Sequence, residues 1–445
     1  MNKLVALSVP DRIQAAMIKA VGDHPIKQLV DNSLHFTRYI TCRKTPMEPA
    51  NLMQKQKEIE DLVLADPAKF KLPKFPEEGD EFGMKNFLSR KRQKVKEIVK
   101  QRVYGWHPIV YDQPNALQYL IGRSAVEFAV LLRIFKEIEK RDPEFKPTSF
   151  FDYGSGVGTG VWAAAELWKS SIFEYYLVDS SKYMNDLSDL ILRDGNENKQ
   201  MSLRNVFYRQ FLPAQGHKYD LVLSAYTMFE MPSLKHRLEV ANNLWNKAQD
   251  YLVFVEVGTN AGFTALNEIR SYLMKVKNVN EEDAFIFAPC THESSCPRYE
   301  LNDGTPCNYE IKFIPLSCTG TQVPQRDTFS YLVIKKGSPS AEDRWPRIVR
   351  PILERHKHVH CRMCTEEGKI DDGIFTVKRH GKLVYRCVKK SNWGDRLPIK
   401  IQQGEAKADG EYFSDDDTDD ESDHDEAVKS KIKSRKPETK SSSET

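Results

Sequence analysis

A glycine-rich segment that should join a strand to a helix constrains the fold of this chain more than any other feature. Residues 152–160 read DYGSGVGTG and overlap the end of a short apolar run, residues 149–153. Glycines here allow a tight turn and let the backbone approach a ligand, because no Cβ stands in the way. A dinucleotide G-x-G-x-x-G is excluded, since Thr159 and Val161 occupy the positions that need glycine. A P-loop is excluded because G-K-[ST] is absent.

The spacing does match D-x-G-x-G-x-G, the first motif of class I S-adenosylmethionine-dependent methyltransferases. The next apolar run, residues 175–178, ends at an aspartate, and one carboxylate there can accept hydrogen bonds from both ribose hydroxyls of the cofactor. Both elements lie at carboxyl ends of strands, where open α/β sheets bind ligands. The alternative is a glycine-rich turn without a ligand. The predicted cofactor contacts are Asp152, Gly154, Ser155, Gly156, Gly158 and Asp179.

Alternation of strands and helices predicts the α/β class. A strong amphipathic helix is expected over residues 115–140, ended by Arg141-Asp-Pro. Apolar strands then alternate with helix-length segments, which predicts a mostly parallel sheet covered on both faces. The expected strands are residues 149–153, 175–178, 219–225 and 251–257, followed by 309–316 and 329–336 as antiparallel edge strands.

The residues expected on the substrate side do not identify a reaction. The segment that follows the strand at residues 219–225 carries neither the N-P-P-Y signature of amino-methylating enzymes nor the P-C of cytosine-C5 enzymes. Ser224, Tyr226, Glu230 and Glu256 could line that side, and none stands out as a base or nucleophile. Catalytic residues are therefore unknown, and the sequence supports cofactor binding better than methyl transfer.

Charge is distributed unevenly along the chain. From Gly404 onward, 14 acidic residues outnumber 7 basic ones, which leaves a net charge of +10 on the 403 residues before it. A basic body fits a nucleic-acid partner, although an ordinary solvated surface explains the same numbers. Within the N-terminal region, residues 90–100 (RKRQKVKEIVK) hold six basic side chains, which predicts either a phosphate-contacting helix or a solvated face. No apolar run is long enough to span a membrane, so no membrane association is expected.

Seven of the eight cysteines lie between Cys290 and Cys387. The N-terminus has no convincing secretory signal, so metal or iron–sulfur ligation is favoured over a disulfide framework. Cys290, Cys296 and Cys307 occupy an irregular, weakly apolar loop that a metal centre could organise. From the residues alone, an iron–sulfur cluster, a zinc site and unligated structural thiols all stay open.

Several motifs in the same order resemble one known family, the methyltransferase-like assembly factors of the mitochondrial small ribosomal subunit. They are the D-Y-G-S-G-V-G-T-G loop, the P-C-x5-C-P region, R-H-K-H-V-H-C-R-M-C, K-R-H-G-K-L-V-Y-R-C and the W-G-D at residues 393–395. The resemblance runs from about residue 104 to 400. It implies a class I methyltransferase fold, binding to small-subunit rRNA in the mitochondrial matrix, and methyl transfer that is unproven or lost.

The resemblance also implies a [4Fe–4S] cluster with its last ligand in the C-terminal segment. Carried over by position, the ligands are Cys290, Cys296, Cys307 and Cys364. Cys361 is then a neighbour, and Cys318 and Cys387 are spare. The resemblance further suggests partners in the assembling mitochondrial small subunit and a monomer off the ribosome. Two alternatives stay open: an active rRNA methyltransferase and a zinc-binding RNA-binding module.

These features divide the chain into four predicted regions. They are a helical basic region over 1–112, a class I methyltransferase-like domain over 113–336 with a cysteine-rich insertion at 288–308, a basic extension over 337–403 with a cluster ligand and a hairpin over residues 374–388, and a disordered tail over 404–445. Basic side chains expected to contact rRNA phosphates are Arg90, Lys91, Arg92, Arg347, Arg350, Lys378, Arg379 and Arg386.

Overall fold

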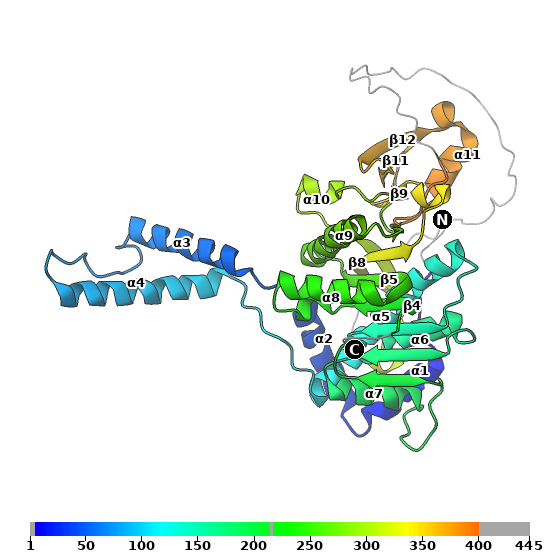
Figure 1. Ribbon diagram of the computed structural model, residues 1–445, viewed down its shortest axis with the longest axis horizontal. Helices are drawn as coiled ribbons and strands as arrows, with labels where there is room; N and C mark the ends of the chain where they lie inside the picture. Colours follow the sequence, from blue (N-terminus) through cyan, green and yellow to red (C-terminus); the bar gives the residue numbers. More distant parts are fainter. Residues whose placement is uncertain (1–4, 214–216, 400–445) are drawn as a thin grey trace, which may run out of the picture. The chain divides into compact units, whose positions relative to one another are not determined.

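The computed structural model describes residues 5–213 and 217–399 and is built around an eight-stranded mixed sheet (Figure 1). The strand order is β3-β2-β1-β4-β5-β8-β6, with β7 pairing with the other end of β8. Strands β1 to β5 pair in parallel, whereas β8 runs antiparallel to β5, β6 and β7. This order, with one antiparallel strand inserted next to β5, is that of class I methyltransferases and confirms the predicted fold class. The strands are β1 (Ser149–Tyr153), β2 (Glu174–Val178), β3 (Val206–Arg209), β4 (Tyr219–Ala225), β5 (Ala248–Val257), β6 (Ala284–Ala288), β7 (Tyr309–Phe313) and β8 (Gln325–Lys336).

Two apolar clusters cover the two faces of this sheet. One packs side chains from α1, α5, α6 and α7 against the sheet, and the other packs side chains from α8 and α9 against it. Burial of whole aromatic side chains such as Phe128, Phe135 and Trp245 contributes on the order of 2 kcal/mol each to folding. The helices of these layers are α1 (Asp11–Val21), α5 (Gln113–Arg141), α6 (Thr159–Trp168), α7 (Lys182–Leu192), α8 (Leu234–Lys247) and α9 (Asn260–Asn280).

Helix α5 begins and ends where local chemistry requires. The Asp112 side chain accepts a hydrogen bond from the Asn115 backbone N–H, and a proline occupies the first turn, where its missing N–H costs nothing. The helix ends at Arg141, directly before Asp142-Pro143, because the residue before a proline is driven out of helical conformation. The predicted helix is thus confirmed within two residues at its start and one at its end.

The N-terminal region is helical, as predicted. Helix α2 (Ile26–Thr41) packs on α5, and α3 (Pro49–Ala65) pairs with α4 (Glu81–Arg102) to form a helical hairpin. The expected proline-containing connector joins α3 to α4. The hairpin has a small core of its own around Ile59, Val63 and Ile98.

The C-terminal extension differs from its prediction. A hairpin turning at His380-Gly381 was expected, but that segment is helix α11 (Val377–Lys390), with Gly381 at φ 78° as a kink inside it. The Thr376 hydroxyl caps this helix by accepting from the Arg379 N–H at 3.1 Å. The hairpin is formed upstream by β11 (His358–Cys364) and β12 (Ile370–Thr376), joined in one small sheet by β9 (Arg347–Ile348) and β10 (Leu353–Glu354). The sequence signal for strand β11 is the alternation of apolar positions in HVHCRMC, residues 358–364.

The sheet edges also differ from their prediction. Strand β8 is antiparallel, as expected, but it lies inside the sheet between β5 and β6. The short strands β3 and β6 were not predicted. The described residues form one compact unit, so the boundaries at 112 and 336 remain predictions, and the predicted disordered tail lies outside the described residues.

A buried ion pair joins the C-terminal extension to α5. The Arg347 guanidinium is only 2% exposed, donates to Glu137 at 2.6 Å and donates to the Gly394 carbonyl at 2.8 Å. Arg347 was expected to contact rRNA phosphates, and this prediction is wrong because its charge is compensated inside the protein. Burial alone would raise the pKa of Glu137, but Arg347 and Arg141 lower it to about 2.

We predict that Glu137→Gln lowers the free energy of unfolding at neutral pH by about 3 kcal/mol, because the buried Arg347 guanidinium loses its counterion and Arg141 keeps only Asp343. The exposed Glu144→Gln should change it by less than about 0.5 kcal/mol. Since the folded pKa is depressed, this stabilisation is present above the unfolded pKa of about 4.3 and is lost as pH falls toward 2. Urea unfolding at neutral and acidic pH measures both effects, and equal values for the two variants would refute the assigned role.

Candidate functional site

The glycine loop after β1 adopts a backbone that only glycine tolerates well. Gly154, Gly156 and Gly158 have φ values of 74°, 50° and 92°. A Cβ on Gly154 would lie 2.1 Å from Thr227 Oγ1, and one on Gly158 would lie 2.5 Å from Ser188 Oγ. A Cβ on Gly156 would meet nothing closer than 4.0 Å. Packing therefore requires the outer two glycines, whereas Gly156 borders space that a ligand can fill.

Asp179 lies directly against this loop. Its two carboxylate oxygens accept hydrogen bonds from the backbone N–H groups of Gly156 at 2.9 Å and Ser181 at 2.8 Å. A carboxylate has about four lone-pair sites, so both oxygens keep capacity for a ribose diol. Burial raises the pKa of Asp179. The structure thus brings the loop and Asp179 together, although the two are separated by a whole helix in the sequence.

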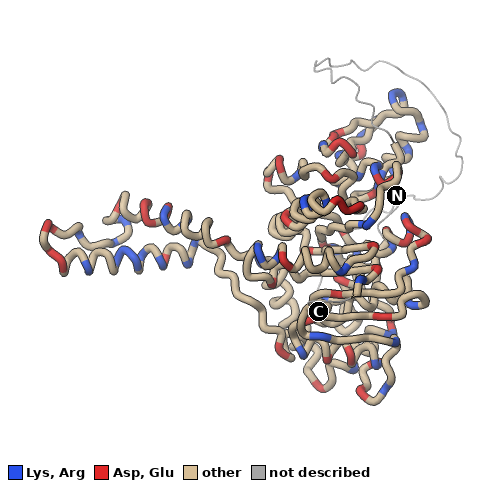
Figure 2. Tube along the Cα trace, viewed as in Figure 1, with Lys and Arg blue, Asp and Glu red and all other residues tan. Residues whose placement is uncertain are grey.

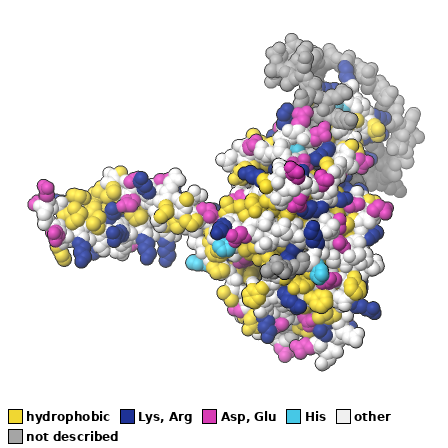
Figure 3. Space-filling view, in the orientation of Figure 1, with side chains coloured by type: hydrophobic (Ala, Val, Ile, Leu, Met, Phe, Trp, Pro, Cys, Tyr) yellow, Lys and Arg dark blue, Asp and Glu magenta, His cyan; other side chains and the backbone are white. Residues whose placement is uncertain are grey.

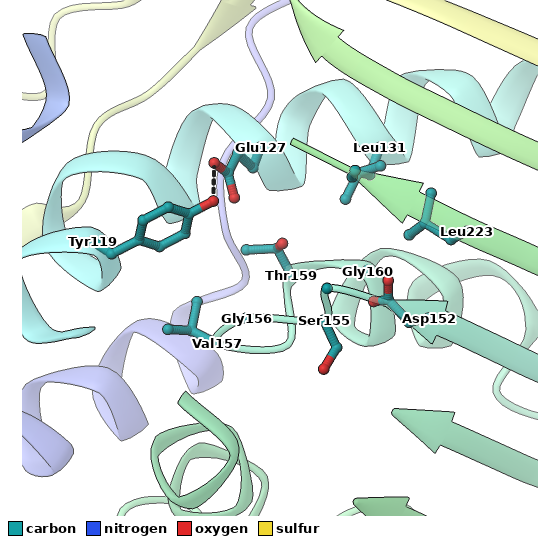
Figure 4. Close-up of a pocket in the computed structure, with 12 residues that line it drawn as sticks. Tyr119, Glu127, Leu131, Asp152, Ser155, Gly156, Val157, Thr159, Gly160 and Leu223 are labelled. Carbon is teal, nitrogen blue, oxygen red and sulfur yellow. Dashed lines mark hydrogen bonds between the residues drawn. The ribbon is translucent and has the colours of Figure 1, made fainter. Parts of the chain in front are cut away.

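A small cavity of about 10 Å³ opens on the loop and is closed from the far side by α5 (Figure 4). Tyr119 donates to Glu127 at 2.7 Å along the α5 wall of this cavity. The Ser155 hydroxyl is buried and has no hydrogen-bond partner among the described residues. Burial and the nearby charges of Asp179 and Glu127 raise the pKa of Asp152. An orphaned hydroxyl, a spare carboxylate and an open glycine face fit the polar amino-acid and ribose groups of S-adenosylmethionine.

A second cavity, of about 30 Å³, shares Tyr119 and Glu127 with the first. Tyr226, Glu230 and Glu256 line it, whereas Ser224 is buried within β4 and does not. Burial raises the pKa of Glu256 to about 8.

An N-terminal segment lines this second cavity. We call residues 103–112 the strap, because they connect α4 to α5 across the cavity. Arg43 forms a short ion pair with Glu230 and donates to the strap carbonyl of His107 at 2.7 Å. Trp106 Nε1 donates to the Phe229 carbonyl at 2.8 Å. Arg43 and the strap were not predicted from the sequence, because their only signal is contact with residues about 120 to 190 positions away.

Glu230 has further partners in the strap. The Tyr111 hydroxyl donates to it at 3.3 Å and the Ile109 N–H at 3.4 Å. Glu230, five residues after the end of β4, therefore holds the chain's own N-terminal region.

The four cysteines predicted as ligands come from separate parts of the fold and converge. Cys290 follows β6, Cys296 precedes the short helix α10 (Pro297–Leu301), Cys307 precedes β7 and Cys364 ends β11. Burial and the neighbouring Cys290, Cys307 and Cys296 raise the pKa of Cys364 far above its usual range. Burial, Cys296 and Cys290 likewise raise the pKa of Cys307 to about 12.

Hydrogen-bond donors surround these sulfurs. His292 Nε2 lies 3.5 Å from Cys364 Sγ, and the Tyr309 hydroxyl lies 3.6 Å from Cys307 Sγ. Burial would lower the pKa of Arg270, but Cys290 and Cys296 raise it, which places its guanidinium beside their sulfurs. Such donors suit thiolates. Even so, within residues 5–213 and 217–399 no group of three or more His, Cys, Asp or Glu side chains has metal-binding geometry, so the ligand set remains a prediction.

The other late cysteines lie apart from this group. Burial and then Asp371 and Asp372 raise the pKa of Cys361 to about 12, with no contribution from another thiol. Cys361 lies three residues before Cys364 on β11, so the two side chains point to opposite faces of the strand. Burial raises the pKa of Cys318.

All remaining basic candidates except Arg350 lie on two helices. Lys and Arg residues recur along α4 (Figure 2). Arg90 and Arg92 are exposed there, while Lys91 pairs with Glu60 of α3 at 2.6 Å. Arg350 lies over the Trp393 ring, with its guanidinium carbon 5.8 Å from the ring centroid. Exposed cations on α11 include Lys378, Arg379 and Arg386. No helix of the described chain is long and apolar enough to cross a membrane.

Comparison with known proteins decides the family. The family model described as "Mitochondrial small ribosomal subunit Rsm22" matches residues 113–398. The chain belongs to the Rsm22 family. This confirms the resemblance found in the sequence. The matched segment contains the glycine loop, Asp179 and all four predicted cluster cysteines, whereas Arg43, the α3–α4 hairpin and the strap precede it.

Individual relatives extend the similarity beyond this segment. Human "Ribosome assembly protein METTL17, mitochondrial" is 34% identical over 367 residues, which cover 82% of this chain and 76% of that protein. The Schizosaccharomyces pombe protein "Rsm22-cox11 tandem protein 2, mitochondrial" is 25% identical over 331 residues, covering 64% of this chain and 43% of its own length.

Among solved structures, the plantazolicin methyltransferase BpumL in complex with SAH shares 13% identity, with a TM-score of 0.31 and coverage of 64% of this Rsm22-family chain and 99% of that one. A putative RNA methyltransferase, PH1948 from Pyrococcus horikoshii, shares 13% identity, with a TM-score of 0.29 and coverage of 55% and 98%.

We predict that Arg43→Ala loosens the strap, because Glu230 then loses its ion-pair partner and the His107 carbonyl loses its donor. Backbone amides of residues 106–111 should exchange with solvent at least about tenfold faster, corresponding to roughly 1.4 kcal/mol of local stability. Arg38→Ala, an exposed change on α2 five residues before Arg43, is the control. Hydrogen exchange followed by mass spectrometry measures both variants, and unchanged protection of the strap in Arg43→Ala would contradict the assigned contacts.

Proposed function

We propose that this Rsm22-family chain is an assembly factor of the mitochondrial small ribosomal subunit that acts in the matrix and binds small-subunit rRNA. The observation that carries this proposal is its similarity to a human mitochondrial ribosome assembly protein over three quarters of that protein's length. The basic surface of α4 and α11 supports a phosphate-bearing partner.

The cofactor part of the proposal is binding of S-adenosylmethionine without an assigned reaction. The glycine loop would hold the amino-acid portion and Asp179 the ribose, while the bound cofactor would supply an activated methyl group. Glu230 holds the strap through its contacts with Arg43 and Tyr111. These contacts restrict the approach of an RNA base to the cavity. They therefore support a structural or gated role for the methyltransferase fold.

The cysteine part of the proposal is a [4Fe–4S] cluster held by Cys290, Cys296, Cys307 and Cys364. The influence of Cys290, Cys296 and Cys307 on the pKa of Cys364, and the donors beside two of the sulfurs, support it. Cys364 belongs to the C-terminal extension and the other three to loops of the large sheet. A shared cluster would therefore join the extension to the sheet and stabilise that junction.

The cluster proposal is tested by Cys364→Ser against Cys361→Ser, which alters a buried thiol of the same strand outside the group. We expect Cys364→Ser to lose iron and sulfide and to lower the melting temperature by at least about 5 °C more than the control, since metal binding contributes folding free energy. Both variants are purified without oxygen and compared by metal analysis and thermal unfolding. Equal metal content and equal melting temperatures would overturn the ligand assignment.

Asp179→Asn separates the assembly factor from an active rRNA methyltransferase, and the exposed Asp186→Asn on α7 is its control. We expect Asp179→Asn to weaken S-adenosylmethionine binding by about tenfold or more, because hydrogen bonds to a charged carboxylate are lost. Calorimetry measures this affinity, and sedimentation of mitochondrial ribosomes measures small-subunit assembly. Intact assembly with weakened binding supports the assembly factor, whereas loss of both, together with loss of rRNA methylation, would support the enzyme.

A further inference from the structure

One side of α4 carries a row of unpaired cations. Lys85, Arg92, Lys96 and Lys100 are all exposed, and their spacing of seven, four and four residues places them on one face of the helix. We call this set the α4 stripe. It spans about 22 Å at 1.5 Å per residue. Figure 3 shows Lys and Arg side chains gathered along one edge of the helical hairpin.

The fold of the hairpin fixes the direction of the stripe. Phe87 and Ile98 are buried, and they lie on the opposite side of α4, with Ile98 in the small core shared with α3. Lys91 and Lys94, which fall outside the stripe, pair with Glu60 and Glu97. Among the described residues no ion pair involves any member of the stripe. Packing therefore turns these four charges away from α3 and leaves them without local compensation.

The residues between the cations indicate what the stripe can bind. Ser89 and Gln93 lie within it, and both are exposed polar side chains able to hydrogen-bond phosphate or hydroxyl oxygens. The stripe itself contains no aromatic side chain on which an unpaired base could stack, and no apolar centre of the kind protein interfaces need. A straight row of cations with polar residues between them is complementary to a phosphate backbone.

The end of the hairpin has the opposite charge. Glu77, Glu78, Asp80 and Glu81 are exposed at the connector and the start of α4. These carboxylates disfavour phosphate there, so the partner must lie along the helix and not at its tip. We propose that the α4 stripe binds the backbone of double-stranded RNA without reading its sequence. This inference rests on the proposed function, since it names the surface through which rRNA is held.

The test uses the full chain and a double-stranded RNA hairpin as probe, with affinity measured by fluorescence anisotropy over a series of salt concentrations. The stripe variant is Lys85→Gln, Arg92→Gln, Lys96→Gln and Lys100→Gln together. Its matched control is Lys57→Gln, Lys69→Gln, Lys71→Gln and Lys74→Gln, which removes the same charge from exposed positions of the same hairpin outside the stripe.

We expect the slope of log affinity against log salt to fall by about 3 in the stripe variant, since each phosphate contact contributes about 0.7–0.9. Affinity at moderate salt should fall roughly tenfold or more, while the control stays near the parent chain and both variants unfold at the parent temperature. Equal losses in the two variants would overturn the proposal, because net charge alone would then explain binding. An unchanged salt slope in the stripe variant would also overturn the proposal. So would a stripe variant that loses binding to anionic phospholipid vesicles but keeps its binding to RNA. If the parent chain binds no RNA, the rRNA part of the proposed function fails as well.

Discussion

Two charged side chains of α5, Arg123 and Glu127, are buried, two more, Glu137 and Arg141, are partly buried, and the surrounding structure compensates all four. Arg123 pairs with Glu127 on the same helix and with Asp327 of β8, while Glu137 and Arg141 pair with Arg347 and Asp343 of the segment after β8. An uncompensated charge in a buried position costs several kcal/mol. The same helix therefore fixes the cavity at the glycine loop at one end and the C-terminal extension at the other.

The cysteine group lies at the junction that these ion pairs create. Arg347 holds β9 against α5, β9 pairs with β11, and β11 ends at Cys364. The other three thiols are delivered by loops around β6, α10 and β7. The pairing of β9 with β11 thus explains why the Cys364 thiol, so distant in sequence, lies near the other three thiols. It also predicts that a centre at these thiols would lock an arrangement that the buried ion pairs have already set.

Much of the fold and of the candidate site could be predicted from the sequence. Physical reasons explain why the remaining features could not. The glycine loop and Asp179 were identifiable because close backbone approach and ribose recognition demand particular residues at fixed spacing. Strand β8 and the helix at 377–390 were misplaced or mistaken, because sheet order and capping by Thr376 depend on contacts that periodicity does not encode. The role of Arg347 could not be read from composition, since a buried and an exposed arginine look alike in sequence. The strap contact with Glu230 had no local signal at all.

The claim on which the account depends most is that Cys290, Cys296, Cys307 and Cys364 hold one iron–sulfur cluster. The most direct measurement is iron, sulfide and zinc content, with a visible absorption spectrum, on the full chain purified without oxygen. We predict about four iron and four sulfide per chain and a broad absorption band near ~400 nm. One zinc without sulfide, or no metal at all, would contradict it.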